Sequence, residues 1–308
     1  MVVIFMGTPG FAVPTLEALV VAGHEIRAVY TQPDRPAGRG QQLVQSPVKQ
    51  AALTLNLPVH QPERIRRPEI VNELRALQAD IMVVVGYGQI IPQSIIDIPR
   101  YGIVNVHGSL LPHYRGAAPI QWAIANGDPI TGVTTMKINA GLDTGDMLLK
   151  AELPILPNET APELSARLAP LGATLCVETL QGLAAGTITP IPQNNAKATL
   201  ARILTKEDAR VDWSRSAAEI HNRLRGFTPW PGAVCHFRSA PLKLHLVEPL
   251  PELTNLHPGT ILPGKPFRVA CGQGTVLAIH ELQQEGRKTV SAENFRNGQH
   301  LSDNEVLT

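Results

Sequence analysis

Apolar and polar positions in the first half of the chain follow two alternating patterns, one typical of strands and one typical of helices. The continuous apolar runs that predict buried strands lie at residues 2–6, 25–31, 80–85 and 102–107. Residues 11–23 and 68–78 instead place apolar side chains at the spacing of one helix face. Apolar strands that alternate with helices predict an α/β fold, with a parallel sheet covered on both faces.

The middle of the chain continues this pattern and then loses it. The predicted elements are a short helix, two strands and a long helix, at residues 118–126, 132–140, 146–154 and 160–185. Residues 188–204 show little periodicity, and we interpret them as a linker. The predicted organisation is therefore a first domain at 1–187 and a second domain at 205–308.

Beyond the linker, the pattern changes to one helix followed by short extended segments. The helix is predicted at residues 216–226, and the segments AVCHF, LKLHLV, FRVACG and TVLAIHEL follow with Gly and Pro between them. Short strands separated by turn residues are typical of a small β-barrel or β-sandwich. A length of 308 residues also favours two domains, because single cores tend to split beyond about 250 to 300 residues.

The charge of the chain is close to balanced. There are 27 Lys and Arg against 26 Asp and Glu, so the bulk composition does not indicate a nucleic-acid partner. The balance holds on both sides of the linker, with 15 basic and 15 acidic residues up to Leu204 and 12 and 11 after it. Any site for a polyanion is therefore expected to be a local patch.

Composition also bears on the compartment. Three widely spaced cysteines match no metal-binding spacing, so we interpret them as reduced structural thiols and expect no metal. No apolar run approaches the roughly 20 residues of a spanning helix, and the chain opens directly into VVIF without a basic leader. These features predict a cytoplasmic protein that does not enter a membrane.

Residues 33–47 (PDRPAGRGQQLVQSP) form a long connection without helix or strand periodicity. Such connections are uncommon in compact domains and are often functional. Arg35 and Arg39 make the stretch locally basic. A functional loop and a solvated surface loop are equally compatible with these observations.

Two polar residues interrupt the apolar strand at 102–107. Asn105 and His107 lie two positions apart, so their side chains share one face, and both lie at the carboxyl end, where parallel sheets bind ligands. An amide and a protonated imidazole are suited to stabilise an oxygen that becomes negative when a nucleophile attacks a carbonyl. A pair buried in the core and bonded to backbone is the alternative interpretation.

A third polar group is expected in the loop NAGLDTGDM, residues 139–147. Asp143 could set the charge of the imidazole or position a water, and an ordinary turn is an equally good interpretation of it; for Asp146 we favour the turn. No GxSxG motif and no nearby Cys supplies a nucleophile, so the attacking group is expected to belong to a substrate. The GTPG turn lacks the GxGxxG fingerprint of dinucleotide binding.

Five segments, in this order, strongly resemble the methionyl-tRNA formyltransferases, and the resemblance covers essentially the whole chain: MGTPGFAVPTLEAL, TQPDRPAGRG, VVVGYGQIIP, NVHGSLLPHYRGAAPIQ and AGLDTGDML. The resemblance implies a Rossmann-like first domain and an OB-like second domain that contacts tRNA. It also implies transfer of a formyl group from 10-formyltetrahydrofolate to the methionine amine of initiator tRNA, without a protein partner.

The resemblance assigns roles to individual residues. Asn105, His107 and Asp143 match the catalytic trio of the family. Its folate-binding stretch is matched by Ser109, Leu110, Leu111 and Pro112. The segment beside its pterin pocket is matched by Tyr87, Gly88, Gln89 and Pro92. The loop around Arg35 and Arg39 resembles the one that marks the narrower family, and we expect both arginines to contact the tRNA.

Some positions depart from the family pattern. Gly10 replaces an acidic residue, His113 and Tyr114 replace Arg-Trp, and Trp122 replaces a basic residue, which changes the charge expected around the acceptor end of the tRNA. Two rival functions remain open. One is formyl transfer to a sugar amine or a purine precursor, and the other is a non-catalytic RNA-binding module.

Overall fold

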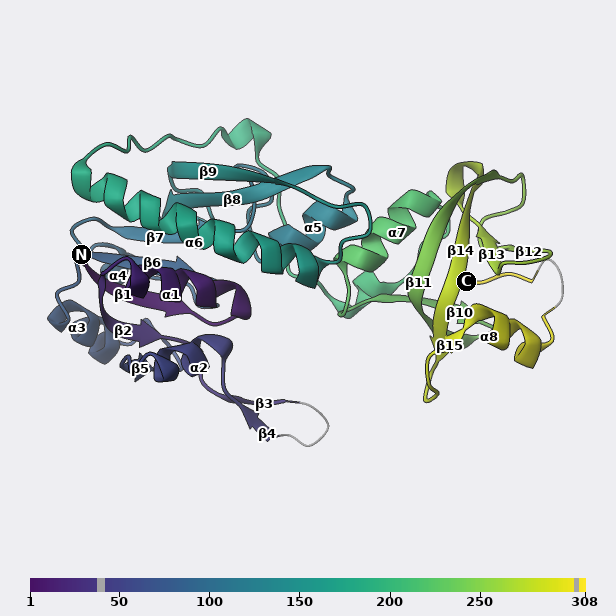
Figure 1. Ribbon diagram of the computed structural model, residues 1–308, viewed down its shortest axis with the longest axis horizontal. Helices are drawn as coiled ribbons and strands as arrows, with labels where there is room; N and C mark the ends of the chain where they lie inside the picture. Colours follow the sequence, from purple (N-terminus) through teal and green to yellow (C-terminus); the bar gives the residue numbers. More distant parts are fainter. Residues whose placement is uncertain (38–41, 302–304) are drawn as a thin grey trace. The chain divides into compact units, whose positions relative to one another are not determined.

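The computed structural model describes residues 1–37, 42–301 and 305–308, and the chain divides into two compact units, each with its own sheet (Figure 1). Unit 1 consists of Met1–Pro119, Ile130–Pro154 and Leu164–Arg202. Unit 2 consists of Ile120–Pro129, Ile155–Glu163 and Ile203–Thr308. The expected α/β domain and the small β domain are both confirmed.

The sheet of unit 1 has seven strands in the order β5-β2-β1-β6-β7-β8-β9. In chain order the strands are β1 (Val2–Gly7), β2 (Glu25–Tyr30), β5 (Val59–His60), β6 (Ile81–Val85), β7 (Ile103–His107), β8 (Ile130–Lys137) and β9 (Met147–Pro154). The first five in the sheet order are parallel, as predicted. β8 pairs antiparallel with β7, and β9 pairs antiparallel with β8, so the sheet is mixed.

The apolar strands are buried on both faces, which explains their continuous apolar runs. Alternate residues such as Ile4, Met6 and Met82 pack in one cluster with Leu74 of α3 and with α4. The intervening residues, Phe5 among them, are fully buried on the other face. The helices of unit 1 are α1 (Val13–Val21), α2 (Pro47–Thr54), α3 (Pro68–Ala76), α4 (Gln93–Ile96) and α6 (Ala161–Ala185).

Helix α6 requires one correction to the sequence analysis. By length and composition alone it could cross a membrane, since it has 25 residues and a mean hydropathy of 1.2 over its most apolar window. The buried helix of a protein core passes the same test, and this helix packs on the sheet. A Cβ atom placed on Gly172 would lie 2.9 Å from the side chain of Val106 in β7, so the apolar face of α6 covers the sheet at close range.

Residues 33–47 contain a short ribbon that the sequence did not predict. Strands β3 (Arg35–Ala37) and β4 (Gln42–Val44) pair antiparallel. Most of this ribbon is exposed, and exposed strands need no apolar alternation, so the pattern could not reveal them. Arg39 lies outside the described residues.

Unit 2 contains a curled antiparallel sheet of six strands, as expected for an OB-like domain. Its strands are β10 (Ala233–Phe237), β11 (Ala240–Leu253), β12 (Ile261–Leu262), β13 (Arg268–Ala270), β14 (Thr275–Gln284) and β15 (Val290–Ser291). Its helices are α5 (Pro119–Ala125), α7 (Ala217–Gly226) and α8 (Ala292–Gln299). Register shifts along the pairing of β11 with β14 allow the long strands to bend.

Helix α5 lies between two segments of unit 1 in the chain but packs in unit 2. Trp122 lies edge-to-face against Phe227, with ring centroids 5.3 Å apart. A Cβ atom on Gly226 would lie 2.7 Å from the carbonyl oxygen of Gln121, so only glycine permits this approach of α5 and α7. The compact units therefore interleave along the chain, whereas the domain limits inferred from the sequence are continuous.

Candidate active site

Asn105 and His107 lie on β7, a strand near the middle of the sheet of unit 1. Both side chains are buried, with 9% and 6% of their surfaces exposed. β7 is flanked by β6 and β8, and it ends at His107, so the pair lies at the carboxyl end of a strand as predicted. Within the part of the chain that the structure describes, the Asn105 side-chain amide has no hydrogen-bond partner. Its N–H groups are therefore available to a ligand.

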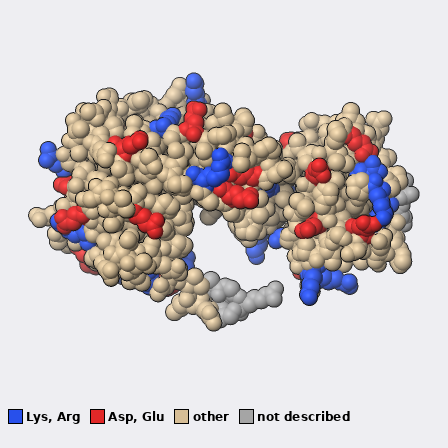
Figure 2. All heavy atoms as spheres, in the orientation of Figure 1, with Lys and Arg blue, Asp and Glu red and all other residues tan. Residues whose placement is uncertain are grey.

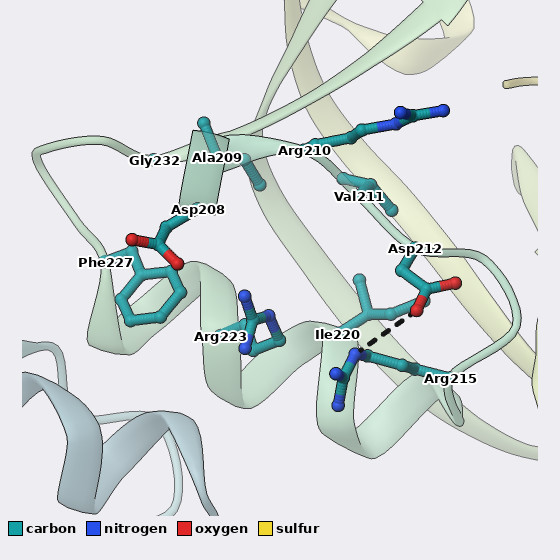
Figure 3. Close-up of a pocket in the computed structure, with 11 residues that line it drawn as sticks. Asp208, Ala209, Arg210, Val211, Asp212, Arg215, Ile220, Arg223, Phe227 and Gly232 are labelled. Carbon is teal, nitrogen blue, oxygen red and sulfur yellow. Dashed lines mark ion pairs between the residues drawn. The ribbon is translucent and has the colours of Figure 1, made fainter. Parts of the chain in front are cut away.

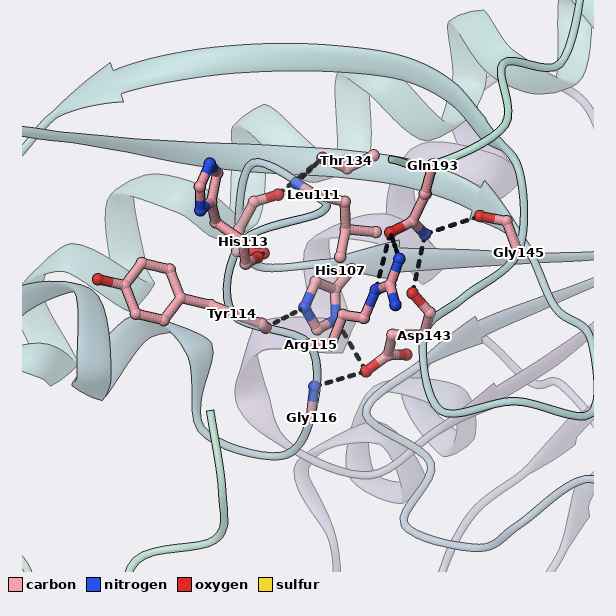
Figure 4. Close-up of polar contacts among 11 residues, drawn as sticks. His107, Leu111, His113, Tyr114, Arg115, Gly116, Thr134, Asp143, Gly145 and Gln193 are labelled. Atoms are coloured by element: carbon pink, nitrogen blue, oxygen red, sulfur yellow. Dashed lines mark hydrogen bonds and ion pairs between the residues drawn. The ribbon is translucent and has the colours of Figure 1, made fainter. Parts of the chain in front are cut away.

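The imidazole of His107 lies between two oxygen acceptors (Figure 4). Its Nε2 is 2.8 Å from the carbonyl oxygen of Tyr114, and since a carbonyl only accepts, Nε2 carries the proton in this hydrogen bond. Its Nδ1 is 3.7 Å from Oδ2 of Asp143, which is ion-pair distance but too long for a hydrogen bond. A proton on Nδ1 would thus face a carboxylate.

Asp143 reaches His107 from the loop between β8 and β9. Its backbone is left-handed, with φ of 50°, and its Oδ2 accepts a hydrogen bond of 2.8 Å from the backbone N–H of Gly116. A Cβ atom on Gly145 would lie 1.8 Å from the carbonyl oxygen of Lys137, so glycine is required where the loop closes. The structure brings Asp143 to the histidine, whereas the Asp146 carbonyl bonds the backbone N–H of Lys137.

The turn that follows β7 contains the predicted folate-binding stretch. The Ser109 hydroxyl donates to the carbonyl oxygen of His113 at 2.6 Å, and the Thr134 hydroxyl bridges the carbonyl of Ser109 and the N–H of Leu111. The side chains of Ser109 and Leu111 are buried, and those of Leu110 and Pro112 are half-buried. The Lys150 ammonium contacts the Leu111 carbonyl, and partial burial lowers the pKa of Lys150. Hydrogen bonds therefore brace this turn, and its contact with folate stays a prediction.

The other predicted folate-binding segment follows β6, next to β7 in the sheet. Tyr87 is buried, which raises the pKa of its hydroxyl, and its carbonyl accepts hydrogen bonds from Thr8 and Gln32. Gly88 is exposed with φ of 83°, and Pro92 lies just before α4. The Gln89 amide bonds the backbone of residues 62 and 65. The segment thus lies at the carboxyl edge of the sheet, where ligands of such sheets bind.

Three residues of the site were missed by the sequence analysis. Arg115 is buried, and its guanidinium donates to Oε1 of Gln193 at 2.9 and 2.8 Å and to Oδ1 of Asn195 at 2.9 Å. Gln193 in turn donates to the carbonyl oxygens of Asp143 and Gly145 at 2.8 and 2.7 Å. Residues 188–204 were interpreted as a linker, so no site residue was expected there. The spacing of residues within a short segment does not predict contacts between Arg115 and residues about 80 positions further along the chain.

The departures from the family pattern fall in different places. Gly10 is exposed at the start of a short 3-10 helix, and His113 is exposed beside the turn. Tyr114 is left-handed with φ of 61°, and its carbonyl holds His107. Trp122 belongs to unit 2, where the Arg223 guanidinium lies 5.9 Å from its ring. Of these four positions, Tyr114 contacts His107 and His113 contacts Ser109, each through its backbone carbonyl.

A shallow pocket in unit 2 offers a second candidate site (Figure 3). Asp208, Arg210, Asp212, Arg215 and Arg223 give it charges of both signs. Arg215 is paired with Asp212 at 3.5 Å, and Arg223 lies 4.8 Å from the ring of Phe227. The pocket has no histidine and no unpaired acid and base placed for proton transfer, so the chemistry is expected in unit 1.

The chain matches known families along nearly its whole length. Residues 1–180 match the family described as formyl transferase, and residues 203–300 match the formyl transferase C-terminal domain. The chain belongs to the formyl transferase family. The methionyl-tRNA formyltransferase of Solibacter usitatus is 60% identical over 304 residues, which are 99% of this chain and 97% of the relative. That of Koribacter versatilis is 56% identical over 97% of this chain and 96% of the relative.

Solved structures share the fold at lower identity. WlaRD, a sugar 3N-formyl transferase crystallised with dTDP and 5-N-formyl-THF, matches with a TM-score of 0.69 and 19% identity, over 94% of this chain and 99% of that chain. HypX from Aquifex aeolicus in complex with tetrahydrofolic acid matches with a TM-score of 0.60 and 17% identity, over 99% of this chain and 50% of that chain. Across the described ranges of our structure, no group of three or more His, Cys, Asp or Glu is placed to hold a metal.

Gly116→Ala is expected to lower kcat for formyl transfer about 10-fold to 100-fold, because small displacements of reacting groups reduce rates strongly. The backbone of Gly116 has φ of 120°, and a Cβ atom there would lie 2.6 Å from the carbonyl oxygen of Ala201. Relief of this clash would move the N–H that binds Asp143. Steady-state kinetics would measure the loss.

Gly186→Ala provides the matched control. Gly186 is also left-handed, with φ of 69°, but nothing lies within 4 Å of an added Cβ atom. The Gly186→Ala substitution therefore introduces similar backbone strain far from Asp143 in the chain. The kcat of this variant should stay near the wild-type value. An equal loss in both variants would trace the effect to general destabilisation.

Proposed function

We propose that this protein transfers a formyl group from 10-formyltetrahydrofolate to the α-amino group of methionine on initiator tRNA, in the cytoplasm and in support of translation initiation. The observation that carries the proposal is the Asn105, His107 and Asp143 arrangement in a formyl transferase whose relatives, at 60% and 56% identity over nearly their full length, are methionyl-tRNA formyltransferases.

The reaction follows from the chemistry of the three residues. The substrate amine attacks the formyl carbon, and the carbonyl oxygen becomes negative as the new C–N bond forms. Asn105 donates a hydrogen bond to that oxygen, and His107 joins it when its Nε2–H turns from the Tyr114 carbonyl to the substrate, in a buried site where such bonds are strong. Collapse of the intermediate breaks the bond to N10 of the folate, and the proton lost by the amine ends on N10.

Asp143 supports this step in two ways. Its carboxylate lies 3.7 Å from Nδ1 of His107, where it orients the ring and places a negative charge beside it. It can also accept the amine proton through a water and return it toward the leaving nitrogen. Folate is proposed to bind along Ser109, Leu110, Leu111 and Pro112 and along Tyr87, Gly88, Gln89 and Pro92.

The two parts of the chain are proposed to divide the work. Residues 1–187 carry the chemistry, residues 205–308 contact the tRNA, and residues 188–204 join them. Figure 2 shows Lys and Arg in small groups interspersed with Asp and Glu on the face drawn, which agrees with a near-neutral composition. Contacts with tRNA phosphates must therefore come from a few local groups.

A direct assay tests the proposal against its rivals. The full-length protein is incubated with 10-formyltetrahydrofolate and, in separate reactions, charged initiator tRNA, an amino sugar nucleotide and a purine-precursor amine. Formylation of the charged tRNA is expected, with little of the other two. Formylation of a small amine alone would replace the proposed substrate, and tRNA binding without any formylation would favour the RNA-binding module.

Replacing Arg35 and Arg39 together by alanine is expected to raise KM for charged tRNA about tenfold. It should also reduce the slope of log(kcat/KM) against log salt by the amount that corresponds to about two lost phosphate contacts. Arg35 is exposed at the start of β3, within reach of solvent and of a large ligand. Kinetics at several salt concentrations, with folate KM as a second readout, measure the effect.

Arg66→Ala is the control for this prediction. Arg66 is an exposed arginine of the same unit, outside the ribbon. Its loss removes one of the two charges that the double variant loses, and it should leave the salt slope unchanged. A wild-type slope in the double variant as well would show that the ribbon is a solvated surface element.

A further inference from the structure

Gln193 connects a buried arginine to the loop that carries Asp143 (Figure 4). We propose that Gln193 is a positioning residue for formyl transfer, which holds the Asp143 loop in its active conformation and is itself oriented by Arg115. The proposal rests on the role proposed above for Asp143. It gives residues 188–204 a task beyond that of a linker.

The hydrogen bonds of Gln193 use its whole amide. Both donor contacts come from Nε2 and end on the carbonyl oxygens of Asp143 and Gly145, at 2.8 and 2.7 Å. Its Oε1 accepts two hydrogen bonds from Arg115, at 2.9 and 2.8 Å. Because a guanidinium only donates and carbonyls only accept, the amide fits in a single orientation. Arg115 therefore fixes which end of Gln193 faces the loop.

The Asp143 loop needs an external support. Asp143 adopts φ of 50°, a conformation that is strained for a residue with a side chain. Its neighbour Leu142 is 65% exposed, so core packing does not hold the loop on that side. The Asp143 carboxylate is held by Gly116, and the backbone on either side of Thr144 is held by Gln193. Loss of the second attachment would leave the position of the carboxylate less defined.

Arg115 is suited to be the fixed end of this connection. It is 7% exposed and, among the residues that the structure describes, it has no ion pair with a carboxylate. Its charge is held by the neutral amide oxygens of Gln193 and Asn195. A carboxylate at position 193 would bind Arg115 at least as well as the amide does, but it would have no N–H to give to the loop.

This difference makes Gln193→Glu the decisive variant. It keeps the size of the side chain and its bond to Arg115, while it replaces two donors by an anion that faces two carbonyl oxygens. The proposal predicts a kcat at least about tenfold lower, with KM for folate and tRNA within about twofold of wild type and an unchanged or higher melting temperature. A residue that only satisfies Arg115 would show no loss of kcat.

Asn194→Asp is the matched control. It makes the same amide-to-acid change one residue away, and its Oδ1 can still accept the bond of 3.0 Å from the N–H of Ala196. Because, among the described residues, the hydrogen bonds of Asn194 go to Ala196 and Lys197 and not to the Asp143 loop, kcat should stay at the wild-type value. A loss equal to that of Gln193→Glu would assign the effect to added negative charge and overturn the proposal.

Combining Gln193→Glu with Asp143→Asn separates this proposal from the one on which it rests. If Gln193 acts through Asp143, the double variant should be no more than about twofold slower than Asp143→Asn alone, since coupled residues are not additive. Impaired Asp143→Asn with fully active Gln193→Glu would overturn the role of Gln193 alone. Full activity of Asp143→Asn would overturn both roles, and multiplied losses would show that Gln193 acts independently of Asp143.

Discussion

Replacing His107 or Asn105 by alanine is expected to lower kcat about 10²-fold to 10³-fold, the range observed when a single oxyanion donor is removed. Both side chains lie at the end of β7. The free amide of Asn105 would donate to the substrate oxygen together with Nε2–H of His107, which in the structure is held by the Tyr114 carbonyl and would have to exchange it for the substrate. The interactions form only as charge develops. The loss should therefore appear in kcat, with the affinity for folate largely kept.

Single-turnover formylation of charged tRNA, with folate binding measured separately, would test this expectation. The double variant should lose less than the product of the two single losses, because both residues serve one oxygen. Folding is checked by thermal melts, since removal of a buried side chain also affects stability. Near-normal turnover in both single variants would exclude Asn105 and His107 as oxyanion donors.

The elements with strong patterns were predictable from the sequence. β1 and β6 were visible because strands buried on both faces require continuous apolar residues. Helix α7 was visible from its periodicity, and its start is fixed by Ser216 and Glu219, whose side chains form a capping box. These signals are local, and the physics that produces them acts over a few residues.

The arrangement of these elements was less predictable. The antiparallel direction of β8 depends on its pairing with β7, and the packing of α5 against α7 depends on contacts such as Trp122 with Phe227. The pairing of Asn105 with Met136 spans 31 positions, and the contact of Trp122 with Phe227 spans 105. A pattern read along the chain does not contain them, and this is also why the compact units interleave while the predicted domains do not.

The same distinction applies to the site. Alternation along β7 placed Asn105 and His107 on one face. For Asp143 the sequence pattern favoured neither a catalytic role nor an ordinary turn, and only the family resemblance indicated the catalytic role. The hydrogen bond from Arg115 to Gln193 spans 78 positions, and no sequence motif near either residue predicts it.

Replacing Asp143 by asparagine is expected to lower kcat about 10²-fold, comparable to the loss of a general base or of the charge that supports a histidine. Asparagine keeps the shape of the side chain, and its oxygen can still accept the N–H of Gly116, now 2.8 Å from Oδ2 of Asp143. What it removes is the negative charge that lies 3.7 Å from Nδ1 of His107. The loop should therefore keep its conformation while the imidazole loses its counter-charge and the amine proton loses its acceptor.

Asp146→Asn tests whether position decides this effect, because Asp146 belongs to the same loop but contacts Lys137 through its carbonyl. The two variants have the same net charge, so any change in tRNA attraction is common to both. Single-turnover rates at saturating folate should fall in Asp143→Asn and remain within about twofold of wild type in Asp146→Asn. Equal rates in the two variants would mean that the carboxylate of Asp143 takes no part in proton transfer, and that its contact with His107 only shapes the loop.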